Sequence, residues 1–178
     1  MKTFIIGIGV GDLRAVAIGG APGLGKSHET KRILNELIGK DNYFVNTCTL
    51  KPTHLFRLLW ENRLPGQTVV IDDCDAIMSD EVALNILKAA LEMKPSRMVS
   101  WGSEKIFVDQ DGEEIPRMFD YQGNVIFLTN LPFSDMANGN NKNAAHLSAL
   151  ESRSLVLDLK IKTKREVMAD RKSTRLNS

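Results

Sequence analysis

The chain has 178 residues, of which 43% are hydrophobic and 25% are charged, and its formal net charge is +1. Such a chain is long enough for one domain with its own core, and its composition is that of an ordinary soluble globular protein. The near-zero charge predicts neither a nucleic-acid nor a membrane partner, so any basic contact surface must be local.

Two further features bear on location. Cys48 and Cys74 are the two cysteines and have no metal-ligand or redox spacing, which is typical of a reducing cytoplasm. The opening segment, residues 1–11, is apolar but too short to span a bilayer, and it has no clear cleavage site. We therefore expect a cytoplasmic protein with no membrane partner.

The first informative segment is residues 20–27, which read GAPGLGKS and fit the pattern G-x-x-x-x-G-K-[ST] at every specified position. A short apolar strand at 14–18 precedes the segment and an amphipathic helix at 26–38 follows it, which is the context that the pattern requires. A glycine-rich turn between a strand and a helix is the alternative, but pattern and context together favour a loop that binds the phosphates of a nucleoside triphosphate.

In such a loop, backbone N–H groups and the helix N-terminus face the phosphate oxygens. Lys26 is expected to reach the β- and γ-phosphates, and the Ser27 hydroxyl to complete the Mg²⁺ shell. The expected nucleotide contacts are the loop and the start of the helix: Gly20, Ala21, Pro22, Gly23, Leu24, Gly25, Lys26, Ser27 and His28.

Strands and helices then alternate along the chain. Further strands are predicted at 43–47, 67–72, 124–129 and 155–159, and further helices at 52–62, from an N-cap at Ser79 to 93, and at 144–151. The apolar face of the helix after Ser79 is expected to be Val82, Ile86, Leu87 and Ala90. This alternation predicts an α/β fold with a parallel sheet covered on both faces.

The segment between residues 95 and 123 departs from this alternation. Residues 105–108 and 113–118 flank a turn that contains Asp111-Gly112, which predicts a β-hairpin inserted before the fourth strand, at about residues 99–123. The hairpin is either a surface protrusion without a functional role or a loop that contacts a substrate.

Carboxylates follow the third predicted strand. The apolar run 69–71 ends in Asp72 and Asp73, and Asp75 comes two residues later. Asp72 is the candidate Mg²⁺ partner, Asp73 the candidate general base for an attacking water, and Asp75 a weaker candidate for either role. A solvated acidic turn is the alternative reading, which the upstream phosphate loop disfavours.

Polar residues also end the next two predicted elements. Asn130 follows the strand 124–129, where ligands of parallel sheets collect, and could bind the γ-phosphate or the attacking water. Taken alone, Asn130 is better explained as the start of the turn at Leu131-Pro132. Arg153 lies between the helix 144–151 and the last strand. A lone arginine is usually a surface residue. Arg153 is a candidate because it follows the loop, the carboxylates and Asn130 in this order along the chain.

With these residues in this order, the chain resembles the core of an AAA+ ATPase from about Gly9 to Lys164. Gly20–Ser27 is similar to Walker A, residues 69–73 to Walker B, Asn130 to sensor 1 and Arg153 to an arginine finger. The resemblance implies a three-layer P-loop sandwich with the strand order 5-1-4-3-2. It also implies a Mg²⁺-dependent ATP hydrolase in a homo-oligomeric ring, usually hexameric, in which Arg153 acts on a neighbour's γ-phosphate. Lys26, Asp73, Asn130 and Arg153 are then the catalytic residues.

The segment 119–130 and the Ser152-Arg153 pair resemble ATPases encoded by tailed phages and associated with replication. The hairpin is similar to one that lines the ring's pore in helicase-like and protein-remodelling members, which implies nucleic-acid contacts by Lys105 or Arg117. The loop from Cys48 to Thr53, with Lys51, is implied as a second pore contact.

The chain also departs from this family. Walker B usually ends Asp-Glu, whereas Asp72-Asp73 stands here, so the base could lie farther from the water and hydrolysis could be slower. The helical lid of the family is missing. Residues 170–178, DRKSTRLNS, back-translate to a string that resembles a sequencing-library adapter, so we expect a core at 1–169 followed by a non-native tail; a natural disordered tail is the alternative.

The leading hypothesis is therefore an ATPase that drives a DNA transaction: helicase loading, clamp loading or translocation, with DNA or a replication protein as the client. The alternatives are an ATP-driven protein remodeller, a P-loop kinase for a small molecule and a nucleotide-gated structural subunit. The kinase hypothesis explains residues 20–27 but predicts neither Asn130 nor Arg153.

Overall fold

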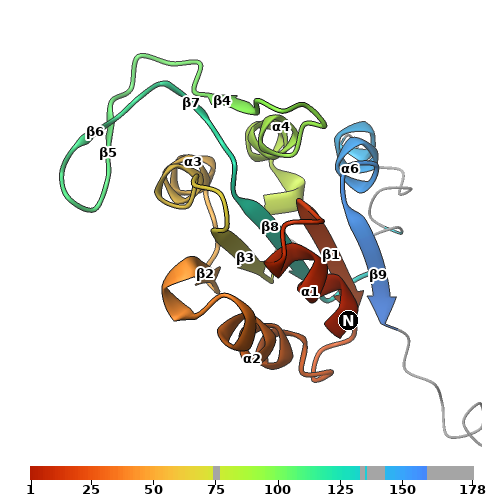
Figure 1. Cartoon of the computed structure of the whole chain (residues 1–178). Coiled ribbons are helices and arrows are strands. Elements are labelled where there is room, and N and C mark those ends of the chain that lie inside the picture. The colour runs from red at the N-terminus through yellow and green to blue at the C-terminus, as the bar shows by residue number, and fades with distance from the viewer. Residues whose placement is uncertain (74–76, 133–134, 136–142, 160–178) are drawn as a thin grey trace, which may run out of the picture.

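The computed structural model describes residues 1–73, 77–132, 135 and 143–159. Asp75, Cys74 and the chain beyond residue 159, including the expected tail at 170–178, therefore lie outside the described residues. The described elements form three layers, with a sheet between two groups of helices (Figure 1). The sheet consists of β1 (Ala15–Gly20), β2 (Tyr43–Asn46), β3 (Thr68–Asp72), β8 (Asn124–Thr129) and β9 (Leu155–Leu159).

All neighbouring strands of this sheet are parallel, and their order is β2-β3-β8-β1-β9. Counted as the five expected strands and read from the β9 edge, this order is 5-1-4-3-2. The registers pair Gly19 with Thr129, Gly20 with Leu159, and Asp72 with Leu128. The carboxyl ends of β1, β3 and β8 therefore meet at one edge of the sheet.

Alternate residues of each central strand pack into different cores, because successive side chains of a strand point to opposite faces. On one face, Val16, Ile18, Val70, Ile126 and Leu128 pack with α1 (Lys2–Gly9) and α2 (Lys26–Leu37). On the other face, the intervening residues pack with α3 (Pro52–Glu61), α4 (Glu81–Ala90) and α6 (Ala144–Glu151). Burial on both faces explains the unbroken apolar runs of these strands.

The helix α1 was not expected, because Gly7 and Gly9 lower the helix propensity of this segment. Its buried residues Ile5 and Ile8 dock on the sheet beside α2. A Cβ on Gly7 would lie 2.7 Å from Leu13 Cδ1, and a Cβ on Gly9 would lie 3.2 Å from Leu37 Cδ1. The glycines therefore permit a close approach that stabilises the helix through packing. None of the described helices is long and apolar enough to cross a membrane.

The start of α4 differs from the sequence-based expectation. Ser79 belongs to a short 3₁₀ turn, Ile77–Ser79, and the N-cap is Asp80, whose Oδ1 accepts hydrogen bonds from the N–H groups of Val82 (2.9 Å) and Ala83 (3.0 Å). The helix then begins one residue late and ends at Ala90 rather than at residue 93. The expectation that Val82 is on the buried face was also wrong: its side chain is 52% exposed.

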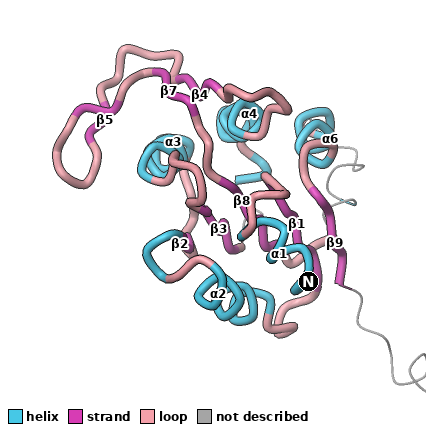
Figure 2. Tube along the Cα trace, in the orientation of Figure 1, coloured by secondary structure: helices cyan, strands magenta, loops and turns pink. Residues whose placement is uncertain are grey.

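The inserted hairpin has two tiers. Its base pairs β4 (Met98–Ser100) with β7 (Met118–Asp120), and its tip pairs β5 (Phe107–Val108) with β6 (Glu114–Ile115), all antiparallel. We call residues 98–120 the ribbon; in Figure 2 it consists mostly of loop with short strands, and its tip extends beyond α3. Phe56 of α3 anchors it, since its ring lies 5.1–5.6 Å from the rings of Trp101, Phe107 and Phe119.

Candidate nucleotide site

The loop between β1 and α2 has the backbone that its glycines permit. Gly23 and Gly25 adopt left-handed conformations, with φ of 81° and 72°, and a Cβ at either position would meet no atom within 4 Å. Space is therefore available there, and it is the backbone conformation that requires glycine. Gly20 is different, because its Cβ would lie 3.0 Å from the Cβ and the carbonyl oxygen of Leu159.

The N-terminus of α2 is suited to an anion. Gly25 is its N-cap and supplies no side-chain acceptor for the first amide groups of the helix. Such amide groups carry partial positive charge and bind phosphate readily. Of the side chains that follow, Ser27 is half-buried and His28 is exposed, while Leu24 is exposed within the loop. The loop and helix end thus fit a phosphate group by their shape and by their donors.

Lys26 is buried, with 6% of its surface exposed, and its ammonium group points back into the loop. Lys26 Nζ donates to the carbonyl oxygens of Gly20 (2.7 Å) and Ala21 (3.2 Å), and to Asn130 Oδ1 (3.4 Å). The carbonyl groups and the amide satisfy a charge that burial would otherwise penalise. A bound phosphate would have to replace these acceptors around the ammonium group.

Asn130 joins the loop to the carboxylates. Its Oδ1 accepts from Lys26, and its Nδ2 donates to Asp73 Oδ1 at 2.9 Å. Asp73 has φ of 55° and is the one non-glycine residue with positive φ that the described chain contains. Asp and Asn tolerate this left-handed conformation better than most residues. The structure therefore places Lys26, Asn130 and Asp73 in one chain of hydrogen bonds that joins the start of α2 to the carboxyl ends of β8 and β3.

Asp72 and Ser27 are the expected Mg²⁺ partners. Asp72 is the half-buried last residue of β3, and Ser27 is the second residue of α2. A carboxylate and a hydroxyl are oxygen donors of the kind that Mg²⁺ prefers, together with phosphate oxygens and water. No group of three or more His, Cys, Asp or Glu side chains able to hold a metal occurs within the described residues, and a shell completed by phosphates needs none.

Arg153 does not join these residues within one chain. It follows α6 and precedes β9, whose first residue pairs with Val16 near the start of β1. It therefore lies at the amino-terminal edge of the sheet, whereas the phosphate loop follows the carboxyl end of β1. Figure 1 shows α6, which precedes Arg153, at the end of β9 opposite its arrowhead. Arg153 Nη1 donates to Ala149 O (2.8 Å), and its Nη2 forms an ion pair with Glu92 Oε2 (3.4 Å).

Sequence reasoning missed Glu92. Its carboxylate accepts from its neighbour's backbone N–H, at Met93, and this hydrogen bond lowers the pKa of Glu92, with a further contribution from Arg153. The residue falls at the end of the amphipathic helix that was expected to run to residue 93, where a glutamate is ordinary. No spacing in the sequence predicts that residue 92 meets residue 153.

The ribbon carries the residues that the resemblance assigned to a pore. Lys105 is exposed above the Phe107 ring, and exposed Arg117 donates to Glu104 O at 3.4 Å. Residues 104–120 contain six acidic and two basic side chains, so the ribbon as a whole is negative. Lys51 is exposed at the N-cap of α3, in the loop after β2.

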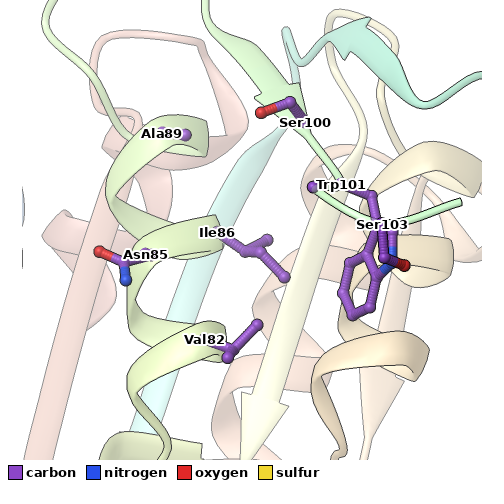
Figure 3. Close-up of a pocket in the computed structure, with 8 residues that line it drawn as sticks. Val82, Asn85, Ile86, Ala89, Ser100, Trp101 and Ser103 are labelled. Carbon is purple, nitrogen blue, oxygen red and sulfur yellow. The ribbon is translucent and has the colours of Figure 1, made fainter.

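A groove of about 400 Å³ lies between α4 and the base of the ribbon. Figure 3 shows Val82 and Ile86 of α4 pointing toward Trp101, with Ser100 and Ser103 on the opposite wall. The groove is separate from the phosphate loop and has a largely apolar lining.

Comparisons with known proteins agree with this architecture. Two substituted forms of RuvB from Thermotoga maritima have TM-scores of 0.56 to the chain, at 18% and 17% sequence identity; they cover 93% and 99% of this chain and 45% and 49% of their own chains. The chain therefore shares the fold of these RuvB structures, an α/β fold with a parallel central sheet.

A protein of Enterobacteria phage T4 is similar in sequence: it is 35% identical over 164 residues, 91% of this chain and 50% of its own. It is described as an uncharacterized 36.7 kDa protein in the nrdC-mobD intergenic region. The chain thus spans about half the length of this curated relative. No family model matches the chain.

Proposed function

We propose that this chain is the nucleotide-binding core of an AAA+ ATPase that hydrolyses ATP with Mg²⁺ to drive a DNA transaction such as helicase loading, clamp loading or translocation. The observation that carries the proposal is the chain of hydrogen bonds from Lys26 through Asn130 to Asp73. It supports a site for hydrolysis rather than for binding alone, because it connects the phosphate-binding lysine to a carboxylate that can accept a proton.

In this mechanism, Lys26 exchanges the carbonyl oxygens of Gly20 and Ala21 for phosphate oxygens when ATP binds. Ser27 and Asp72 would hold Mg²⁺, which would neutralise charge on the phosphates. Asp73 accepts a proton from water as the water oxygen bonds to the γ-phosphorus and the bond to the bridging oxygen of ADP breaks. Asn130 orients the water or the γ-phosphate once its amide is released from Lys26.

Arg153 completes the site in a ring, for which a hexamer is the expected form. An arginine stabilises the charge that spreads over the transferred phosphoryl group, and such a residue can come from a neighbouring subunit. The position of Arg153 at the sheet edge opposite the loop supports this arrangement. A small-molecule kinase gives Arg153 no role.

The test is ATPase activity of the chain with Mg²⁺, measured without DNA and with single- or double-stranded DNA. We expect hydrolysis that DNA accelerates and that Lys26→Ala abolishes through loss of nucleotide binding. Normal ATP affinity in Lys26→Ala would contradict the phosphate loop, and hydrolysis unaffected by either DNA would contradict the DNA transaction.

A protein client is the second candidate, and the ribbon favours it. Its acidic side chains would repel a phosphodiester backbone. Ile106 and Met118 are 61% and 58% exposed on the same ribbon, which suits a partner segment that is both apolar and basic. Stimulation of hydrolysis by a basic protein of the replication machinery, but not by DNA alone, would select this candidate.

A further inference from the structure

The guanidinium group of Arg153 is engaged within its own subunit. One nitrogen donates to Ala149 O, and another pairs with Glu92 Oε2 at 3.4 Å, while the side chain is 22% exposed. Its Nε is buried without a hydrogen-bond partner in the described structure. Arg153 is therefore held near the surface with donors to spare.

Glu92 is well placed to act as the counter-ion. Its carboxylate is 35% exposed and is charged at neutral pH, because the Met93 N–H and the Arg153 charge lower its pKa. The backbone around it is fixed by Arg14, whose Nη1 donates to the carbonyl oxygens of Glu92 (2.9 Å) and Lys94 (3.0 Å). The position of the carboxylate is thus set by the fold, through the junction between α4 and the ribbon.

The pair is weak enough to be exchanged. A partly exposed ion pair at 3.4 Å, with one oxygen facing one nitrogen, contributes little to stability. A phosphate group carries more charge and can accept two parallel N–H bonds from a guanidinium, which is a stronger arrangement. A triphosphate on a neighbouring subunit would therefore displace Glu92 from Arg153.

We propose that Glu92 is a positioning residue that retains Arg153 in the free subunit and releases it to a neighbour's triphosphate, so that Glu92 raises the protein concentration at which the ring forms and turns over. This inference rests on the proposed function, because it requires Arg153 to act between subunits. The contact between Glu92 and Arg153 competes with the contact between Arg153 and a neighbour's triphosphate, and it delays ring assembly until nucleotide is bound.

The test measures ATPase activity against protein concentration for Glu92→Gln. Glutamine can still accept from the Met93 N–H but carries no charge. We expect the half-maximal concentration to fall about two- to fivefold, the size that exposed ion pairs support, with the rate at saturation retained. The matched control is Glu151→Gln, which makes the same charge change on α6, where no described side-chain contact joins it to Arg153; its half-maximal concentration should match that of the unmodified chain.

An unchanged or higher half-maximal concentration in Glu92→Gln would overturn the inference. In an Arg153→Ala background, Glu92→Gln should have no further effect on assembly, measured by sedimentation with a non-hydrolysable ATP analogue. Full activity of Arg153→Ala would instead contradict the proposed role of Arg153. If Arg153→Ala loses activity but Glu92→Gln has the half-maximal concentration of the unmodified chain, only the proposed role of Glu92 is contradicted.

Discussion

At the residue scale, the proposed chemistry depends on Asp73, which stands where the resemblance leads one to expect a longer glutamate. Its left-handed backbone, with φ of 55°, accompanies a carboxylate that reaches Asn130 Nδ2 at 2.9 Å. The backbone conformation and the hydrogen bond together fix a short side chain at the carboxyl edge of the sheet. In the proposed mechanism, the position of the Asp73 carboxylate, rather than the length of its side chain, permits it to act as a base.

We expect Asp73→Asn to retain ATP binding and to lose turnover by about 10²-fold or more, because the amide cannot accept a proton. Asparagine also tolerates positive φ, and its Oδ1 can still accept from Asn130, so the thermal midpoint should change little. Nucleotide titration and steady-state hydrolysis measure the two effects separately. Hydrolysis at the unmodified rate would assign the base to another residue.

At the scale of elements, two local contacts determine how α3 and α4 carry the ribbon. Phe56 joins α3 to the ribbon through aromatic contacts, and Asp80 caps α4, whose Val82 and Ile86 line the groove of Figure 3. Neither contact involves a residue of the loop at 20–27. They are therefore expected to affect stability without a direct effect on nucleotide affinity.

Phe56→Ala should lower the free energy of unfolding by about 3–5 kcal/mol, since it removes a fully buried ring and leaves a cavity. The control is Ile106→Ala on the exposed side of the ribbon, for which about 0.5 kcal/mol or less is expected. Denaturant unfolding measures both. Equal effects for the two variants would show that the ribbon does not pack on α3 as described.

Asp80→Ala should lower the free energy of unfolding by about 1 kcal/mol, because the first amide groups of α4 lose their acceptor. Asp80→Asn preserves an acceptor at this position and should lose much less. If urea denaturation gave both variants the stability of the unmodified chain, Asp80 would not be the cap.

The sequence predicted correctly those features that depend on local residue patterns. The positions of the five strands follow from apolar runs, and the loop follows from its spaced glycines. It misplaced the cap of α4 because Ser79 and Asp80 are both good caps and the preceding 3₁₀ turn decides between them. It could not find α1 or Glu92, since these depend on packing against α2 and on a meeting of residues 61 positions apart.

At the scale of the whole molecule, the proposed active site is divided. Lys26, Asn130 and Asp73 meet at the carboxyl edge of the sheet, and Arg153 lies at the amino edge of the same chain. In a closed ring, such opposite edges can face each other across every interface. We therefore expect hydrolysis to need residues from two subunits.

This requirement is tested by mixing two variants that are each expected to be inactive, Lys26→Ala and Arg153→Ala. Each alone should lack turnover, one through loss of nucleotide binding and the other through loss of the arginine. At equal concentrations, about one interface in four should pair an intact loop with an intact arginine, so activity should return to about a quarter of the unmodified rate. A mixture that is no more active than the sum of its separate components would contradict a site shared between subunits.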